Sequence, residues 1–415
     1  MLENRDGYWI TTHSTQTIDA IHRFTDQSLG YGRMAKPAIL DAIAADPTCA
    51  LAHAYAAAYY LAQENAVTWQ QAKPHLHIAN SLADQTTERE KRYIQAINAW
   101  AVGDIHRAIA LHESITEQFP RDLMAVQQGQ YHYFYLGDRQ GLLNIAEKVL
   151  SANGDQPYLY GMVAFGLEQC HRLPEAERMA YRAIEITHCD PWAHHAIAHV
   201  LETQRRTDAG ILWMEQFAET WERCNTMLYT HNYWHLALFY LAKGDMQTVL
   251  DLYDQRVWGW ACKASPKDQV GAIALLLRLE LQGVEVGDRW IHLCPYLFAR
   301  IHEHALPFQD LHYVYALAKA GHGDRAREML TSMQVHALTI PPQLQSAWTE
   351  LAIPAARGLL AHAREDWQIA MAELKPVLSR LWAIGGSHAQ RNLFNQIYQD
   401  AAAKIEAYPA LRTAS

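Results

Sequence analysis

A loose repeat of about 34 residues is the feature that most restricts how this 415-residue chain can fold. A short phrase built around Gly-Asp recurs at Gly103, Gly137 and Gly244, and weaker versions stand at Arg172 and Arg206. In chain order, the steps between these five positions are 34, 35, 34 and 38 residues. Repeats of this length are typical of stacked helix pairs, because one pair cannot bury its apolar face without a neighbour. The sequence therefore predicts an array of helix pairs.

The segments between these markers have the pattern of helices. Over 176–186, apolar and small residues recur at i, i+3, i+4, i+7 and i+8, the spacing of one helix face. Proline stands at four expected helix starts, after Asp46, Phe119, Gln156 and Asp190. Proline is tolerated in a first turn and breaks a helix interior. The pattern resembles the tetratricopeptide signature and predicts an all-α, right-handed α-solenoid of tetratricopeptide-like helix–turn–helix repeats, with an irregular helical bundle as the alternative.

No Ser- or Gly-rich linker divides the chain, so we expect a single helical-repeat domain over residues 1–415. The period loosens toward the C-terminus, since the Gly-Asp marker at Gly323 follows the one at Gly244 by 79 residues. The expected division is 1–45 as N-terminal capping helices, 46–258 as regular repeats, and 259–415 as irregular C-terminal repeats and a cap.

Composition restricts the partners and the compartment. With 35 Lys and Arg against 44 Asp and Glu, the net charge of −9 argues against nucleic acid as a partner, because phosphate binding needs clustered cations. No apolar run is long enough to span a membrane, and the N-terminus lacks the pattern of a signal peptide. Six scattered cysteines form no Cys-x-x-Cys pair. We therefore expect a cytoplasmic protein with reduced thiols and no membrane partner.

Three blocks of sequence resemble the tetratricopeptide repeat protein 38 family. They are DPWAHHAIAHVLE at 190–202, HNYWH at 231–235 followed by YLAKG at 240–244, and GGSHAQR at 385–391. Weaker echoes extend the resemblance from about Asp46 to Phe394, and one of them is the Asp-x-His at Asp310 and His312. The resemblance implies an all-helical soluble fold. It brings no established activity.

The chain contains 23 histidines, and four of them form two helically spaced pairs inside these blocks. His195 and His199 are i, i+4, and Glu202 extends the same face by three residues, while His231 and His235 are i, i+4 in the next repeat. First helices of successive repeats stack side by side. We therefore expect the five side chains to converge within about 10 Å, the size of one small site.

This set of side chains suits more than one function. Imidazole and carboxylate groups are ligands for a divalent metal such as zinc, and they also serve in general acid–base catalysis. Buried histidines that only pack between repeats are the alternative. The residues favour a His/Glu-lined interior pocket for a metal or a small polar ligand, and they leave open whether it is catalytic. His194 is expected to lie off this face, either exposed to solvent or packed outward.

Further ligand-binding candidates come from the same pattern. Trp192, Asn232 and Trp234 accompany the histidines in their blocks, and His53 occupies a first helix in an early repeat. In the third block, Ser387 follows two glycines and can help to hold an anion at a helix start, with Gln390 as an amide partner and Arg391 as a cation. The alternative is an ordinary serine cap with an arginine that ties the last helix to its neighbour.

Asp310 and His312 are i, i+2 and point apart on a helix, so only one of them can face a groove. Asp310 can instead orient a histidine, as carboxylates behind metal ligands do. The sequence thus predicts a small polar or anionic ligand. The competing function is a non-enzymatic scaffold that binds a peptide or protein in its concave groove. The ligand, any reaction and the oligomeric state are left open.

Overall fold

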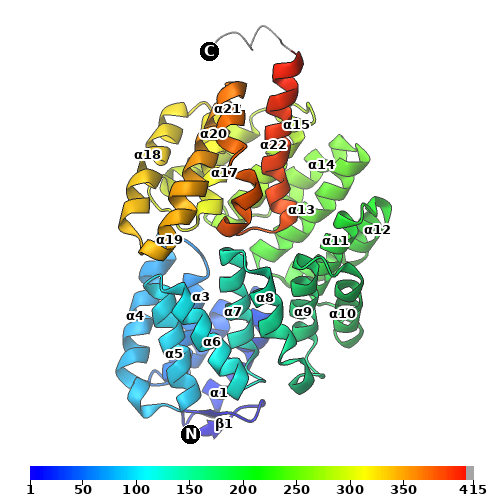
Figure 1. Ribbon diagram of the computed structural model, residues 1–415. Coiled ribbons are helices and arrows are strands. Elements are labelled where there is room, and N and C mark those ends of the chain that lie inside the picture. Colours follow the sequence, from blue (N-terminus) through cyan, green and yellow to red (C-terminus); the bar gives the residue numbers. More distant parts are fainter. Residues whose placement is uncertain (408–415) are drawn as a thin grey trace. The chain divides into compact units, whose positions relative to one another are not determined.

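Most of the described chain is helical (Figure 1). The structure is a computed structural model, and it describes residues 1–407. A two-stranded antiparallel ribbon at the N-terminus, in which Leu2 faces Ile10, is the single sheet in this part of the chain. The described chain divides into two compact units, one formed by residues 1–134 and 138–235 and the other by 135–137 and 236–407.

The elements that begin in the first unit are β1 (Leu2–Glu3), β2 (Trp9–Ile10), α1 (Thr15–Leu29), α2 (Ala35–Ala45), α3 (Ala50–Leu61), α4 (Ala66–Leu82), α5 (Glu88–Ala101), α6 (Ile105–Gln118), α7 (Leu123–Leu136), α8 (Arg139–Glu147), α9 (Pro157–Gln169), α10 (Leu173–Ile186), α11 (Pro191–Thr203), α12 (Thr207–Phe217) and α13 (Thr226–Lys243). Short 3-10 turns η1 (Ala83–Gln85), η2 (Leu150–Ala152) and η3 (Ala218–Arg223) follow α4, α8 and α12.

The helices of the second unit are α14 (Met246–Leu252), α15 (Pro266–Leu281), α16 (Arg289–Leu293), α17 (Pro307–Lys319), α18 (Gly323–Thr339), α19 (Pro342–Ser346), α20 (Ile353–Ala363), α21 (Trp367–Leu374) and α22 (His388–Ala407). Between them lie the π-helical turns η4 (Tyr253–Val257) and η6 (Ala347–Ala352) and the 3-10 turns η5 (Cys294–Arg300) and η7 (Leu378–Ile384).

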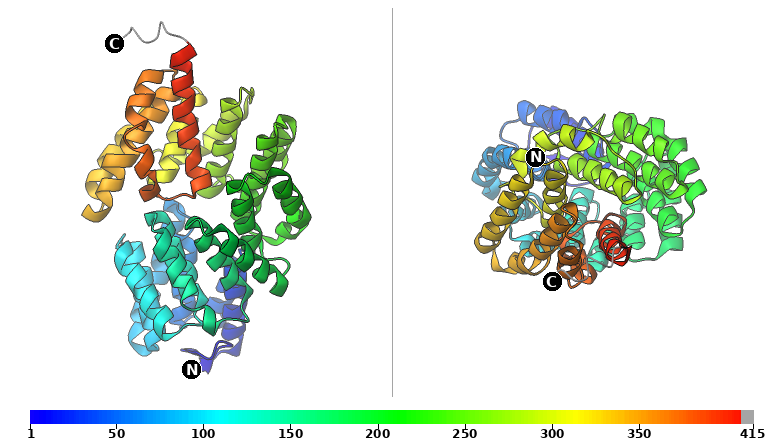
Figure 2. Two further views of the ribbon diagram at one scale, coloured as in Figure 1. Left: turned by 45° about the vertical axis from the view of Figure 1, so that its right-hand side comes forward. Right: turned by 90° about the horizontal axis from the view of Figure 1, so that it is seen from above.

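Within each unit, sequential helices pack as pairs, and the pairs stack on one another. In the first unit α1 packs on α2, α3 on α4, α5 on α6 and α9 on α10, while the first helices of neighbouring pairs touch, as α3 does α5 and α9 does α11. The second unit repeats this with α17 on α18 and α20 on α21. Figure 2 shows these helix pairs from two further sides. The predicted fold class, an all-α solenoid of tetratricopeptide-like repeats, is confirmed.

The repeated Gly-Asp phrase forms the turn inside a helix pair. Gly103 has φ +78°, a left-handed conformation that glycine adopts without strain, and the next residue, Asp104, accepts a hydrogen bond from the backbone N–H of Arg107. In the two weaker versions His171 and Arg205 hold the same left-handed position, with φ of +59° and +57°. The left-handed turn is therefore present in these two repeats although another residue replaces the glycine.

Two sequence markers are displaced in the structure. Pro157 and Pro191 open α9 and α11 as predicted, but Pro47 and Pro120 precede α3 and α7 by three residues, so the prediction for these two was wrong. Here the chain makes a further turn before it enters the helix. At the last Gly-Asp marker, Gly323 already begins α18, and Gly321 takes the left-handed position instead.

The first unit buries α11 along almost its whole length, because helices pack on it from several sides. Both α9 and α12 contact it. The link between α1 and α2 also reaches the start of α11, where the rings of Tyr31 and Trp192 stack with centroids 4.9 Å apart. Tyr31 accepts a backbone hydrogen bond from Asn225, and a β-bridge joins Gly32 to Cys224. Polar side chains on α11 are thus withdrawn from solvent.

Candidate functional site

Helices α11 and α13 bring four histidines together inside the first unit. His199 Nε2 lies 3.1 Å from His195 Nε2, and His231 Nε2 lies 3.1 Å from the same atom. With His235, the four side chains offer ring nitrogens that all lie within 4.8 Å of one another. The two i, i+4 pairs therefore face each other across neighbouring first helices, as their spacing predicts. The role of the cluster is not tested by this geometry and stays a prediction.

Glu202 closes one side of this histidine cluster. Its Oε2 accepts from Nδ1 of His235 at 3.3 Å. The His235 side chain is fully buried, whereas that of Glu202 keeps 29% of its surface exposed. Because the carboxylate holds the Nδ1 proton, Nε2 of His235 carries the lone pair. That atom has no hydrogen-bond partner among the described residues.

A second carboxylate, Glu168 on α9, was not among the predicted site residues. Its Oε1 lies 3.8 Å from Nδ1 of His199, and both side chains are fully buried. Its other oxygen accepts from the amide of Gln169 at 2.6 Å. Glu168 stands 34 residues before Glu202, one repeat earlier. The repeat period itself was thus the signal that could have identified it.

Aromatic rings pack against the cluster. The Trp192 and Phe165 rings lie 4.6 and 5.5 Å from that of His195, and Trp234 stacks on His231 at 5.3 Å. Burial lowers the pKa of His195 well below its usual range, and the neighbouring His231 and His235 lower it further. Burial and His235 lower the pKa of His231 in the same direction. A neutral imidazole is therefore the favoured state of His195 and of His231.

The contacts of His195 Nε2 leave a hydrogen-bonding deficit. One neutral ring nitrogen either donates one proton or offers one lone pair, yet this atom meets two other Nε2 atoms at 3.1 Å. A shared cation resolves that conflict. Zinc–nitrogen bonds of about 2.0–2.1 Å in a tetrahedron place ligand atoms about 3.3–3.4 Å apart. Two separations are thus close to those of a tetrahedral site, and the remaining ligand atoms lie within 4.8 Å, so the donor set fits a tetrahedral transition metal once the rings turn toward it.

His194 packs outward from the cluster and is not exposed to solvent. It is off the cluster face, but it is fully buried. Its Nε2 bonds to the carbonyl of His188 at 2.9 Å, and its Nδ1 accepts from the indole N–H of Trp221 at 3.2 Å. Burial lowers the pKa of His194 to about 3. The reason is that α12 and η3 cover the side of α11 that faces away from the cluster, and the spacing of residues on α11 and α13 alone does not show this.

The other predicted residues of the first unit divide into two groups. Trp192 and Trp234 line the cluster, and Asn232 donates to the carbonyl of Pro191 at 3.3 Å, which ties α13 to the start of α11. His53 lies apart from these contacts. Its Nδ1 meets Nδ1 of His75 on α4 at 3.0 Å, and its Nε2 meets the carbonyl of Pro47.

The third block caps the last helix of the second unit. Ser387 and Gln390 bond reciprocally, the amide oxygen of Gln390 accepting from the Ser387 backbone at 2.9 Å and the serine hydroxyl from the Gln390 backbone at 3.2 Å. Arg391 donates to the carbonyls of Gly385 and Gly386. These contacts are those of a capping box. A ligand role for these residues stays a prediction.

Asp310 and His312 point apart on α17, as their spacing requires. His312 Nδ1 bonds to the carbonyl of Phe308 at 2.8 Å, one turn earlier. Asp310 Oδ2 lies 2.6 Å from Nδ1 of His304, in the turn that precedes the helix. The sequence suggested that Asp310 orients a histidine, and the structure supplies His304 as that histidine.

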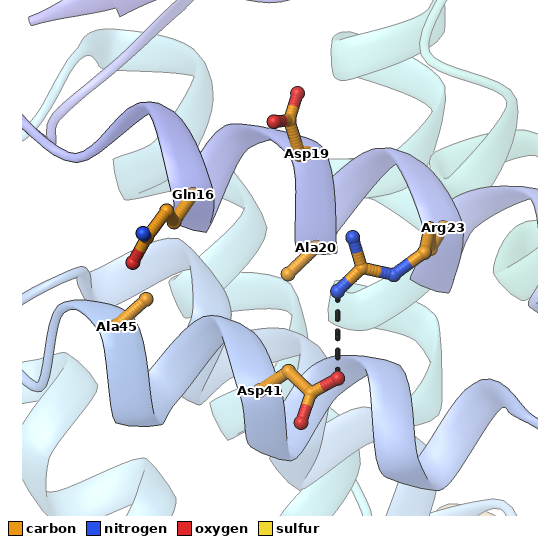
Figure 3. Close-up of a pocket in the computed structure, with 6 residues that line it drawn as sticks. All are labelled: Gln16, Asp19, Ala20, Arg23, Asp41 and Ala45. Carbon is orange, nitrogen blue, oxygen red and sulfur yellow. Dashed lines mark hydrogen bonds and ion pairs between the residues drawn. The ribbon is translucent and has the colours of Figure 1, made fainter.

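A surface cavity of about 280 Å³ lies between α1 and α2, away from every predicted site residue (Figure 3). Gln16, Asp19, Ala20, Arg23, Asp41 and Ala45 line it. Arg23 and Asp41 meet across it at 3.4 Å, and both side chains are more than half exposed. Such an exposed pair is a weak interaction and gives the cavity no particular chemistry.

The chain has only low similarity to the known proteins reported next. No protein-family model matches the chain. Similar solved structures include human IFIT1 with PPP-AAAA (TM-score 0.46, 12% identity, 98% of this chain and 90% of that one). Cut9 of the Cut9–Hcn1 hetero-tetramer has a TM-score of 0.45 and 12% identity, and the match covers 92% of this chain and 71% of that one. Yeast Tom70 has a TM-score of 0.43 and 12% identity, and the match covers 85% of this chain and 90% of that one.

Fold and site together define the class of protein. The chain is an α-helical repeat protein of tetratricopeptide-like type whose first unit encloses a histidine cluster. No described helix is both long and apolar enough to cross a membrane. All six cysteines lie in the described part of the chain and none forms a disulfide. The resemblance to the tetratricopeptide repeat protein 38 family stays a prediction.

Asp190, which caps α11 ahead of the cluster, gives a prediction of pH dependence. It accepts from the backbone of Trp192 and Ala193, and burial raises its pKa to about 7. Between pH 4 and 7 the unfolded chain loses this proton while the folded chain keeps it, so the native protein loses stability as the pH rises. Asp190→Asn keeps the cap without the charge.

The quantity to follow is the free energy of unfolding of Asp190→Asn minus that of the unmodified chain. We expect this difference to rise between pH 4 and 7 by up to about 1.4 kcal/mol per pH unit and then to level off. Urea titrations at pH 4.5, 6 and 8 measure this difference. A difference that does not change with pH would contradict it.

Proposed function

We propose that this protein binds one divalent transition metal ion of zinc type through His195, His199, His231 and His235. The observation that carries this function is the convergence of four ring nitrogens within 4.8 Å in a buried part of the first unit. Neutral imidazole is a preferred ligand of zinc and of its neighbours in the periodic table. Without a cation, a neutral His195 Nε2 can form a linear hydrogen bond with only one of the two nitrogens that approach it.

The two carboxylates support the same function. Metal-bound histidines usually pass their second N–H to a carboxylate, which fixes the tautomer and makes the ring a better ligand. Glu202 stands in this relation to His235, and Glu168 lies toward Nδ1 of His199. These two contacts come from different repeats and leave Nε2 of each ring available to the centre.

The geometry favours an ion over an organic molecule at the centre. Two of the nitrogen separations are 3.1 Å, close to the edge of a metal tetrahedron, and all four ligand atoms lie within 4.8 Å of one another, which favours a small ion over a larger ligand. Four protein ligands also close the coordination sphere, which is the arrangement of structural metal sites; catalytic sites keep one position open for water. We therefore propose that the metal joins α11 to α13, with α9 held through Glu168.

Metal analysis tests this function directly. We expect the full chain, purified without a chelator, to contain about one equivalent of zinc or a similar ion by elemental mass spectrometry. For the chelator-stripped protein, added Zn²⁺ at about 100 times its Kd is expected to stabilise folding by about 2.7 kcal/mol, seen as a higher melting temperature.

The matched control is His112→Asn. His112 is buried in the same unit on α6, outside the cluster, so the zinc-dependent rise is expected to persist in this variant. Purified protein without metal, together with a melting temperature that added Zn²⁺, Co²⁺ or Ni²⁺ leaves unchanged, would overturn the proposal and leave packing between repeats as the role of the cluster.

A further inference from the structure

Three side chains of the second unit lie in the order carboxylate, imidazole, hydroxyl. Asp310 Oδ2 lies 2.6 Å from Nδ1 of His304, and Nε2 of His304 lies 2.7 Å from Oγ of Ser332. They come from α17, from the turn before it and from α18, which packs on α17. Hydrogen-bond distances of this kind are the geometric mark of a base poised beside a nucleophile.

Local structure fixes the imidazole between its partners. His304 has φ +49°, a left-handed conformation that is uncommon for a residue with a side chain. The rings of His336 and Trp348 pack against it, with centroids 5.1 and 5.9 Å away. His304 and Asp310 are buried, while Ser332 is half-buried.

The carboxylate decides which nitrogen of His304 is basic. Ionised Asp310 can only accept, so the proton of the imidazole lies on Nδ1 and the lone pair of Nε2 points at the hydroxyl of Ser332. Burial raises the pKa of Asp310 to about 6, and the bond from His304 opposes this rise. Above that pH the carboxylate is charged and the hydroxyl donates to His304.

We propose that Ser332, with His304 as its base and Asp310 as the residue that positions the base, is a nucleophilic site for acyl esters. Oγ forms a bond to the ester carbonyl carbon while its proton passes to Nε2 of His304. The bond from that carbon to the leaving oxygen then breaks, and His304 returns the proton to the departing alcohol. Water, deprotonated by the same imidazole, hydrolyses the acyl-serine and restores the hydroxyl.

The oxyanion of this reaction needs a side-chain donor. Ser332 lies inside α18, where the backbone N–H groups are used by the helix. His302, whose side chain is 66% exposed, has Nδ1 2.9 Å from Ser332 Oγ and Nε2 2.9 Å from Glu328 Oε1. This exposed imidazole is a donor next to the hydroxyl and has to turn from Oγ toward the ester oxygen to serve there. With one such donor, we expect slow turnover and an acyl-serine that accumulates.

Covalent labelling tests the site in the full chain. With an alkyl fluorophosphonate, Oγ bonds to phosphorus, fluoride leaves and the proton passes to His304. We expect peptide mass spectrometry to place the label on Ser332 at a rate about 100-fold or more above that of Ser81, an exposed helical serine without a histidine partner. The labelling rate plotted against pH should fit the titration of a single base. Labelling at this position should vanish in Ser332→Ala, and its rate should fall at least about 100-fold in Asp310→Asn. Labelling of Ser332 no faster than that of Ser81 would overturn the proposal.

A second variant decides the question if Asp310→Asn does not fold. In Ser332→Cys, His304 is expected to lower the pKa of the new thiol, so that alkylation by iodoacetamide at pH 6.5 exceeds that of Ser81→Cys by about tenfold or more. The alkylated peptides are separated by mass spectrometry from those of the six native cysteines. Equal rates and equal pH profiles for the two thiols would show that His304 does not activate this position and would overturn the proposal.

Discussion

The variant His195→Asn is expected to bind zinc at least about 100-fold more weakly than the native chain, the largest loss among single changes in the histidine cluster. His195 Nε2 is the atom that both His199 and His231 approach at 3.1 Å, so its removal takes away the centre of the ligand set. The zinc-dependent rise in melting temperature should disappear with it. Competition with a chromogenic chelator gives the affinity, and thermal melts give the stabilisation.

Glu202→Gln is expected to lose less zinc affinity than His195→Asn and serves as the intermediate case. Loss of an outer carboxylate behind a metal-bound histidine typically weakens binding by about 10–100-fold, because the ring stays a ligand but loses its orientation. The expected order of affinities is native chain and His112→Asn first, Glu202→Gln next and His195→Asn last. An unchanged zinc affinity in His195→Asn would remove the cluster as the metal site, whatever the metal content of the native chain.

The variant Asp122→Ala is expected to destabilise the first unit by about 3–5 kcal/mol, because it leaves a buried cation without its counter-ion. Arg89 Nη1 and Asp122 Oδ2 are 2.6 Å apart, with 4% and 3% of the two side chains exposed. Two further nitrogens of Arg89 have no hydrogen-bond partner among the described residues, so Asp122 supplies its short ion pair. Urea unfolding followed by circular dichroism measures the change.

The exposed pair of Arg121 and Asp155 is the matched control. Its members are also one repeat apart and lie 3.1 Å from each other, but 32% and 62% of the side chains are exposed. Asp155→Ala should therefore cost no more than about 1 kcal/mol. The double change of Arg89→Met with Asp122→Leu should recover most of the loss, because a buried ion pair is seldom better than a well-packed apolar one. A loss below about 1 kcal/mol in Asp122→Ala would contradict the uncompensated-charge argument.

Spacing along the chain predicted what depends on local geometry. The repeat period predicted the helix pairs, and the two i, i+4 histidine pairs predicted which side chains of α11 and α13 would meet. The burial of His194 was not predictable in this way, because it depends on how α12 and η3 pack on the far side of α11. Glu168 was missed although the period points to it.

The array of Asp310, His304 and Ser332 shows a different limit. Asp310 was expected to orient a histidine, but the partner could not be named from the sequence. His304 reaches both groups through a left-handed backbone turn, and Ser332 lies 28 residues further along the chain on another helix. Neither the turn nor the packing of α18 on α17 leaves a periodic signal in the residues.

The bonds of residues 31–33 to residues 223–225 also determine how the first unit comes apart. In an open row of repeats each pair touches only its neighbours, so the ends fray independently. Here Tyr31 and Arg33 exchange backbone hydrogen bonds with residues about 190 positions later, which ties the first helices to the segment just before α13. We therefore expect the two ends of the first unit to unfold together and not to fray independently. Amide protons of α1 and of the start of α13 should therefore show similar protection from exchange. Deletion of the N-terminal helices should lower the protection around His231, although the deletion removes none of the four histidines of the cluster.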